Sequence, residues 1–155
     1  MHFPIIKIEP IDLPKEAWST DLDYDDWTLN EHTDYYGDIY NAEERKQVIK
    51  SNWLKELFDG IATIDTERET ITFLDKQTIR NTLYDYYIQK VQELSEAASQ
   101  QKLSGYNFRD AGYRFRGFYT LFMEGYGKTS LQFVEDAQYY AGETWQIGNI
   151  FDAHF

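Results

Sequence analysis

The sequence predicts an α+β fold in which two helices pack on a mostly antiparallel, aromatic-rich sheet, with an acidic N-terminal segment. Residues 41–60 and 75–101 carry apolar side chains at helical spacing. Residues 61–65 and 70–74 are rich in Thr and Ile and flank a polar turn, as in a β-hairpin. The C-terminal third alternates apolar and polar residues, which is typical of strands.

The chain length of 155 residues favours a single domain spanning 1–155. We divide it into an acidic segment, 9–44, and an α+β body, 45–155. Within the N-terminal part, residues 3–8 predict a short strand that the following prolines end or kink. Residues 15–40 predict loops with short helical or extended pieces.

The first helix has a clear beginning and end. Asn41 is expected to cap its N-terminus, with Glu44 at the capping-box spacing, and Gly60 is expected to end it. One face of this helix is apolar and is predicted to be buried: Val48, Ile49, Trp53, Leu57 and Phe58.

The second helix follows the hairpin. Asp75 is expected to cap it, and it is expected to run to about Gln101. Its predicted buried stripe is apolar along the whole length of the helix: Ile79, Leu83, Tyr86 or Tyr87, Val91, Leu94 and Ala98.

The C-terminal part is expected to return to the sheet. Residues 102–112 predict a loop, 113–123 a strand and 124–128 a turn. Residues 129–141 fit either a returning strand or a helix, and 143–151 predict a last strand.

Negative charge is concentrated near the N-terminus. The chain has 27 acidic and 15 basic residues, a net charge of −12. Residues 1–44 hold 12 acids and 2 bases, a net of −10, whereas residues 45–155 hold 15 acids and 13 bases, a net of −2. The densest part, residues 21–38, contains seven acids and no base, with four aromatic residues interspersed among the acids. Solvated acidic tails usually lack aromatics, so this pattern indicates either a loop that its aromatics anchor to the core while the acids face water, or a contact surface.

Several chemistries are disfavoured by the sequence. The chain has no Cys, which excludes disulfides, thiolate metal sites and a thiol nucleophile. Asp21, Asp23 and Asp25 have the spacing that begins a calcium loop, but Asp26 and His32 stand where its Gly and Glu belong. Gly127 lacks the companion glycine of a phosphate-binding loop. We therefore expect no metal, no cofactor and no enzymatic activity.

We expect a cytoplasmic protein that does not contact membranes, because the N-terminus lacks a signal-peptide pattern and no run of about 18 apolar residues exists. Direct binding to nucleic acid is not expected at this net charge. Arg109, Arg114 and Arg116 form a small basic group that suits salt bridges to the acidic segment. The 13 tyrosines leave a homodimer open, although no heptad repeat indicates how it would form.

These observations predict an acidic inhibitor that occupies the basic nucleic-acid-binding surface of a nuclease or DNA-binding effector. Such DNA mimicry suits anti-restriction or anti-CRISPR proteins of phages and mobile elements, and it also suits immunity proteins. The expected partner-binding residues are Asp21, Asp23, Asp25, Asp26, Trp27, Glu31, Asp34, Tyr35, Tyr36 and Asp38.

Two other classes remain open. Trp145, Tyr139 and Tyr140 could offer stacking faces for a carbohydrate or another small ligand. The many carboxylates also leave room for a small carboxylate-dependent hydrolase, although the sequence singles out no acid pair.

Overall fold

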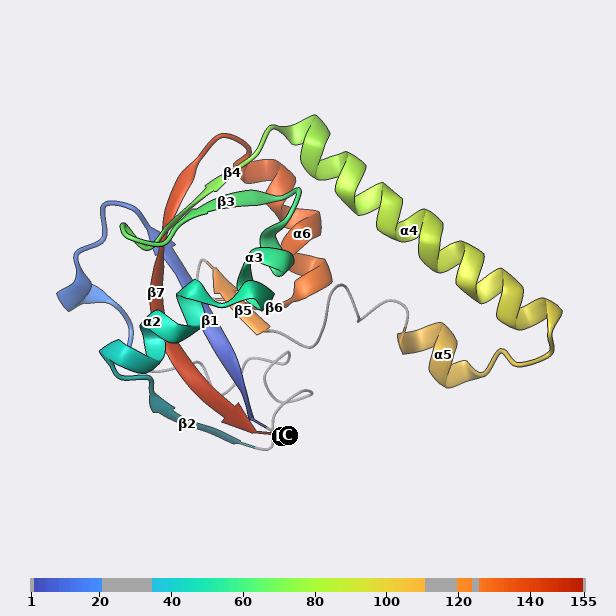
Figure 1. The fold of residues 1–155 in the computed structure, drawn as a ribbon, viewed down its shortest axis with the longest axis horizontal. Coiled ribbons are helices and arrows are strands. Elements are labelled where there is room, and N and C mark those ends of the chain that lie inside the picture. Colours follow the sequence, from blue (N-terminus) through green and yellow to red (C-terminus); the bar gives the residue numbers. More distant parts are fainter. Residues whose placement is uncertain (1, 21–34, 111–119, 124–125, 155) are drawn as a thin grey trace.

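The centre of the sheet is formed by two long strands, β1 (His2–Pro10) and β7 (Thr144–His154), which run antiparallel in this computed structural model (Figure 1). The structure describes residues 2–20, 35–110, 120–123 and 126–154. The fold is of the α+β class with a mostly antiparallel sheet, as predicted, but it has several helices rather than two.

Seven described strands make up the sheet, in the order β3-β4-β7-β1-β5-β6, with β2 also paired to β7. The remaining strands are short: β2 (Tyr35–Ile39), β3 (Ala62–Asp65), β4 (Thr70–Phe73), β5 (Thr120–Met123) and β6 (Tyr126–Thr129). All described strand pairs are antiparallel except β1 with β5. One edge of β7 pairs with β1, and the other edge pairs first with β4 and then with β2. The hairpin predicted at 61–65 and 70–74 is the pair β3–β4.

The segment predicted as one helix over 41–60 forms two, α2 (Ala42–Lys50) and α3 (Asn52–Phe58). Asn41 and Glu44 form the expected capping box of α2. The break lies at Ser51, which has an extended backbone and caps α3 by accepting a hydrogen bond from the Leu54 amide at 3.4 Å. A Ser side chain can replace helical hydrogen bonds in this way, and apolar spacing alone does not reveal it.

The long helix α4 (Lys76–Ser99) begins at the Asp75 cap as predicted. The prediction of its buried stripe is wrong in the second half. Ile79 and Leu83 are buried, but Val91 is 65% exposed. The reason is visible in Figure 1, where α4 starts against the body and then projects away from it.

The segment from 102 to 112 is not entirely a loop, because it contains the short helix α5 (Gly105–Asp110). Residues 129–141, for which the sequence allowed two readings, are mostly helical: α6 (Ser130–Ala137) is followed by the 3₁₀ turn η2 (Gln138–Tyr140). Thr129 and Gln132 form a second capping box, which favours the helix over a strand.

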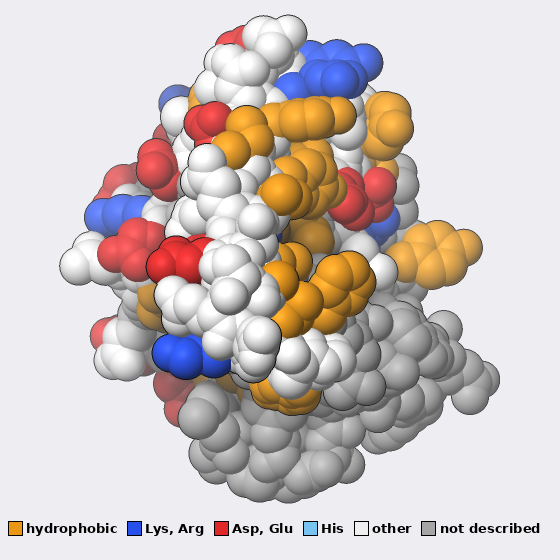
Figure 2. All heavy atoms as spheres, turned by 90° about the vertical axis from the view of Figure 1, so that its right-hand side faces the viewer, with side chains coloured by type: hydrophobic (Ala, Val, Ile, Leu, Met, Phe, Trp, Pro, Cys, Tyr) orange, Lys and Arg blue, Asp and Glu red, His pale blue; other side chains and the backbone are white. Residues whose placement is uncertain are grey.

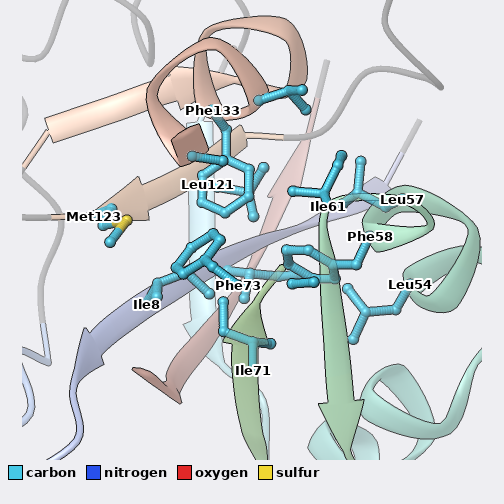
Figure 3. Packing of buried hydrophobic residues seen from close by; sticks show 14 of the residues in the cluster. Ile8, Leu54, Leu57, Phe58, Ile61, Ile71, Phe73, Leu121, Met123 and Phe133 are labelled. Atoms are coloured by element: carbon cyan, nitrogen blue, oxygen red, sulfur yellow. The ribbon is translucent and has the colours of Figure 1, made fainter. Parts of the chain in front are cut away.

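The main core lies between the sheet and the helices α3, α4 and α6. Figure 3 shows side chains from β1, β4, α3 and α6 pointing toward one another. The Phe133 ring of α6 packs edge-on to Phe58 of α3, with ring centres 5.7 Å apart, and it also lies 5.9 Å from Phe73 of β4. This contact joins two helices to the sheet. Among the described residues, no helix combines the length and apolar character that a membrane crossing needs.

Candidate functional site

The expected binding residues divide between two parts of the chain. Tyr35 and Tyr36 lie in β2, where their backbones pair with His154 and Ala153 of β7, and Asp38 of the same strand is exposed. The other seven lie outside the described residues: Asp21, Asp23, Asp25, Asp26, Trp27, Glu31 and Asp34. The structure does describe the chain on both sides of this stretch.

The chain before the stretch is held by side chains of β7. The Gln146 side-chain amide donates to the backbone carbonyls of Pro10 and Leu13, both at 2.6 Å. The Asn149 side-chain amide donates to the carbonyl of Ser19 at 3.0 Å. Residues 10–19, which include the 3₁₀ turn η1 (Lys15–Ala17), are thus fixed along one strand.

Trp18 provides a second attachment. Its side chain is buried, and the Arg45 guanidinium lies 5.3 Å from the centre of the indole ring. The Lys15 ammonium lies 5.6 Å from the same ring. Such cation–π contacts strengthen when the cation is shielded from water, as Arg45 is.

Arg45 of α2 connects this attachment to the sheet. Its Nε donates to the Gly148 carbonyl at 3.1 Å, its Nη2 donates to the Ile147 carbonyl, and its Nη1 pairs with the Glu69 carboxylate. The β1–β7 register shifts at this place, which leaves an extra residue in β7 and creates a bulge. The bulge supplies the carbonyls that accept hydrogen bonds from the guanidinium fork.

The backbone of this bulge packs closely against β1. A Cβ atom at Gly148 would lie 2.6 Å from Cγ of Glu9. The partly buried Glu9 carboxyl has a raised pKa, chiefly because burial disfavours its charged form, and Lys7 opposes the shift. The bulge therefore packs directly against the strand that leads into the acidic region.

The chain after the stretch is held at the far end of β7. Ile39 pairs with Phe151, and the Tyr40 amide donates to the Ile150 carbonyl at 2.8 Å. The Tyr40 hydroxyl donates to the Asp152 carboxylate at 3.3 Å. Asn149 and His154, which mark the two attachment points, are five residues apart on β7, or ~17 Å along an extended strand.

The face formed by these attachments is acidic at its surface. The described bases of residues 2–45 are Lys7, Lys15 and Arg45, and each lies over an aromatic ring. The exposed acids of the β1–η1 connection, η1, β2 and the start of α2 outnumber the exposed bases of η1 and α2, which are Lys15, Lys46 and Lys50. These acids are Asp12, Glu16, Asp38, Glu43 and Glu44. Figure 1 shows η1, β2 and α2 together at the end of the molecule away from the projecting part of α4. We call this surface the acidic face.

Tyr40 makes the stability of the fold depend on pH in the alkaline range. The pKa of its hydroxyl is raised, first by burial and then by the Asp152 carboxylate. The folded state therefore keeps this proton more tightly than the unfolded state, whose Tyr pKa is about 10. The resulting stabilisation is present below about pH 10 and is lost as the pH rises through the folded-state pKa.

We expect the free energy of unfolding, measured by urea titration from about pH 8 to pH 11, to fall more steeply in the wild type than in Tyr40→Phe. Equal slopes would contradict this assignment.

Sequence reasoning missed the residues that hold the acidic region in place: Trp18, Arg45, Gln146 and Asn149. Arg45 could have been found, because it precedes the buried Ile49 by four residues and so lies on the same side of the helix. The sequence assigned the docking of the acidic segment to Arg109, Arg114 and Arg116 instead. Arg114 and Arg116 lie outside the described residues, as does the side chain of Arg109.

The aromatic residues considered for ligand stacking lie at the edge of the core. Tyr140 packs edge-on to Trp145, with ring centres 5.4 Å apart, and both rings contact the core cluster. Tyr139 is 72% exposed. Within residues 2–20, 35–110, 120–123 and 126–154, no group of three or more His, Asp or Glu side chains is arranged to hold a metal ion. Comparison of the chain with protein-family models, curated proteins and solved structures found no match.

Proposed function

We propose that this protein is an acidic inhibitor that occupies the basic nucleic-acid-binding surface of a nuclease or DNA-binding effector. The observation that carries the proposal is the arrangement of charge. Most of the net charge of −12 lies in residues 1–44, and the described chain on each side of residues 21–34 is fixed to β7. The bases of the same region are only two, the buried Lys7 and the exposed Lys15, so acids outnumber bases at its surface.

The chemistry of the expected contact is ionic. In an extended chain, alternate residues such as Asp21, Asp23 and Asp25 would be ~6.6 Å apart, which is close to the spacing of every second phosphate in one DNA strand. Arg and Lys side chains placed to bind phosphate would also accept carboxylates. Long-range attraction would make association fast and sensitive to salt, while Trp and Tyr side chains would add short-range contact energy.

The test neutralises the charge of the acidic segment without changing its length. The variant replaces five acids with their amide: Asp21, Asp23, Asp25, Asp26 and Asp34 to Asn. Exposed ion pairs contribute about 0.2–1 kcal/mol each, so five of them together contribute about 1–5 kcal/mol, and the affinity for the partner is expected to fall roughly 5- to 4,000-fold. Capture of partners from lysates of the native host or its competitors at low and high salt, with elution by duplex DNA, measures the effect.

A matched control separates position from total charge. Five exposed acids outside the acidic region are replaced by the corresponding amides: Glu56, Asp59, Glu67, Asp85 and Glu96. This variant loses the same number of charges and is expected to retain the partner. If both variants lose the partner equally, the total charge matters and the acidic segment does not. If neither loses it, the acidic segment is a solvated surface and the proposal is wrong.

A further inference from the structure

The projecting part of α4 carries an apolar surface that the described body leaves uncovered. The helix has 24 residues, or ~36 Å of length, and its N-terminal part packs against α6 and η2. Its buried residues, Ile79 and Leu83, belong to that first part. Figure 1 shows the C-terminal part projecting into solvent, where it leads to α5.

Three large side chains form a stripe on this helix. Tyr84, Ile88 and Val91 are 53%, 54% and 65% exposed, and their spacing of four and then three residues places them on one side of the helix. In α5, Tyr106 and Phe108 are 59% and 66% exposed. Figure 2 views the molecule from this side and shows hydrophobic side chains gathered in a column. Contiguous exposed apolar surface of this kind marks an interaction site.

The charge of this region favours a second copy of the chain as the occupant. Residues 76–108 contain four bases and three acids, a net of +1 in a chain whose total is −12. Two copies repel each other through their acidic faces, which lie at the end of the molecule away from the projecting part of α4. The α4–α5 region is therefore the surface on which two copies can approach at the lowest electrostatic cost.

The distribution of charge along α4 also selects a direction. Lys76 and Arg80 lie in its first turns, whereas Glu96 lies toward its end, near Glu93, whose carboxylate pairs with Lys90 at 2.7 Å. An antiparallel pair of α4 helices brings the basic end of each close to the acidic end of the other. The antiparallel arrangement also points the two helix dipoles in opposite directions, which is electrostatically favourable. It keeps the bodies of the two copies at opposite ends of the helix pair.

We propose that the protein forms a homodimer through antiparallel packing of two α4 helices about a twofold axis near Ile88. The same surface serves on both copies, as a twofold interface requires. The stripe by itself is smaller than the ~800 Å² per partner of a standard interface. The exposed side chains of Leu103, Tyr106 and Phe108 enlarge the contact, and we expect a dimer of micromolar affinity.

The oligomeric state tests the proposal. Light scattering coupled to gel filtration is expected to show a dimer at about 100 µM. The Ile88→Glu/Val91→Glu variant is expected to be a monomer, because dimerisation would bury two carboxylates of each copy. Both positions are exposed, so circular dichroism should show an unchanged fold. The Gln47→Glu/Gln89→Glu control adds the same two charges at exposed positions outside the stripe and is expected to remain a dimer. A wild-type monomer at this concentration, or a dimer that survives the stripe variant, overturns the proposal.

The absence of Cys from the chain allows the direction to be tested by cross-linking. Ile88→Cys, close to the axis, is expected to form an intermolecular disulfide under oxidation. In the antiparallel pair, Ser95→Cys places its two copies ~21 Å apart, since each lies seven residues from the axis at ~1.5 Å per residue. A disulfide needs Cα atoms ~4.4–6.8 Å apart. Equal cross-linking of both variants would indicate a parallel pair and overturn the antiparallel arrangement.

Discussion

Replacing Arg45 with Ala is expected to lower the free energy of unfolding by about 3–5 kcal/mol, the range found when one partner of a buried ion pair is removed. The guanidinium donates hydrogen bonds to the Glu69 carboxylate and to the carbonyls of Ile147 and Gly148. It also lies over the Trp18 ring. Its loss leaves a largely buried carboxylate and two strand carbonyls without this donor. Urea denaturation measures the change. The intrinsic fluorescence should also move to longer wavelength as Trp18 becomes solvated.

Arg68→Ala is the matched control for this substitution. Arg68 also pairs with an acid, Asp65, at 3.8 Å, but its side chain is 84% exposed. Exposed pairs of this kind contribute ~0–1 kcal/mol. If Arg45→Ala lowers the free energy of unfolding as little as Arg68→Ala does, Arg45 does not hold α2, β7 and Trp18 together.

Replacing Phe133 with Ala is expected to cost about 3–5 kcal/mol, because the substitution leaves a cavity where two helices and the sheet meet. The side chain is 1% exposed, and its ring contacts Phe58 and Phe73. At roughly 2–4 °C per kcal/mol for a chain of this size, the melting temperature should fall by about 6–20 °C. Differential scanning calorimetry measures this shift.

Tyr126→Ala removes an aromatic ring that is 69% exposed, so its melting temperature should lie close to that of the wild type. If the two variants melt at the same temperature, Phe133 is not at the centre of the core.

Local signals in the sequence predicted much of the fold. Asn41 and Asp75 cap helices where their positions indicated, and the Thr- and Ile-rich segments form the hairpin. Two features needed the tertiary structure. Ser51 breaks the first helical segment with a side-chain cap that apolar spacing does not show. Val91 has the spacing of a core residue but is exposed, because the body covers only the beginning of α4.

The candidate site could be predicted only in part. The excess of acids in residues 1–44 can be counted in the sequence. The attachments come from residues more than 100 positions away: Gln146 holds Pro10 and Leu13, and Asn149 holds Ser19. Polar side chains that bind distant backbone carbonyls leave no periodic pattern, so sequence reasoning had no means of finding them.

The two proposals concern opposite sides of the molecule and fit together. A dimer formed through α4 would direct its two acidic faces away from each other, because each face lies at the end of its molecule away from the projecting part of α4. Such a dimer could engage two copies of a basic partner. Loss of dimerisation in the stripe variant would leave each acidic face intact, so the two proposals can fail independently.

The central claim is that the acidic face and nucleic acid compete for one surface of the partner. The most direct measurement is the apparent Kd of the captured partner for this protein at increasing concentrations of duplex DNA and at several salt concentrations. We expect the apparent Kd to rise in proportion to the DNA concentration, and the dependence of log Kd on log salt to be weaker in the five-acid variant. A ternary complex of partner, DNA and this protein, or an affinity that does not depend on salt, would contradict the account.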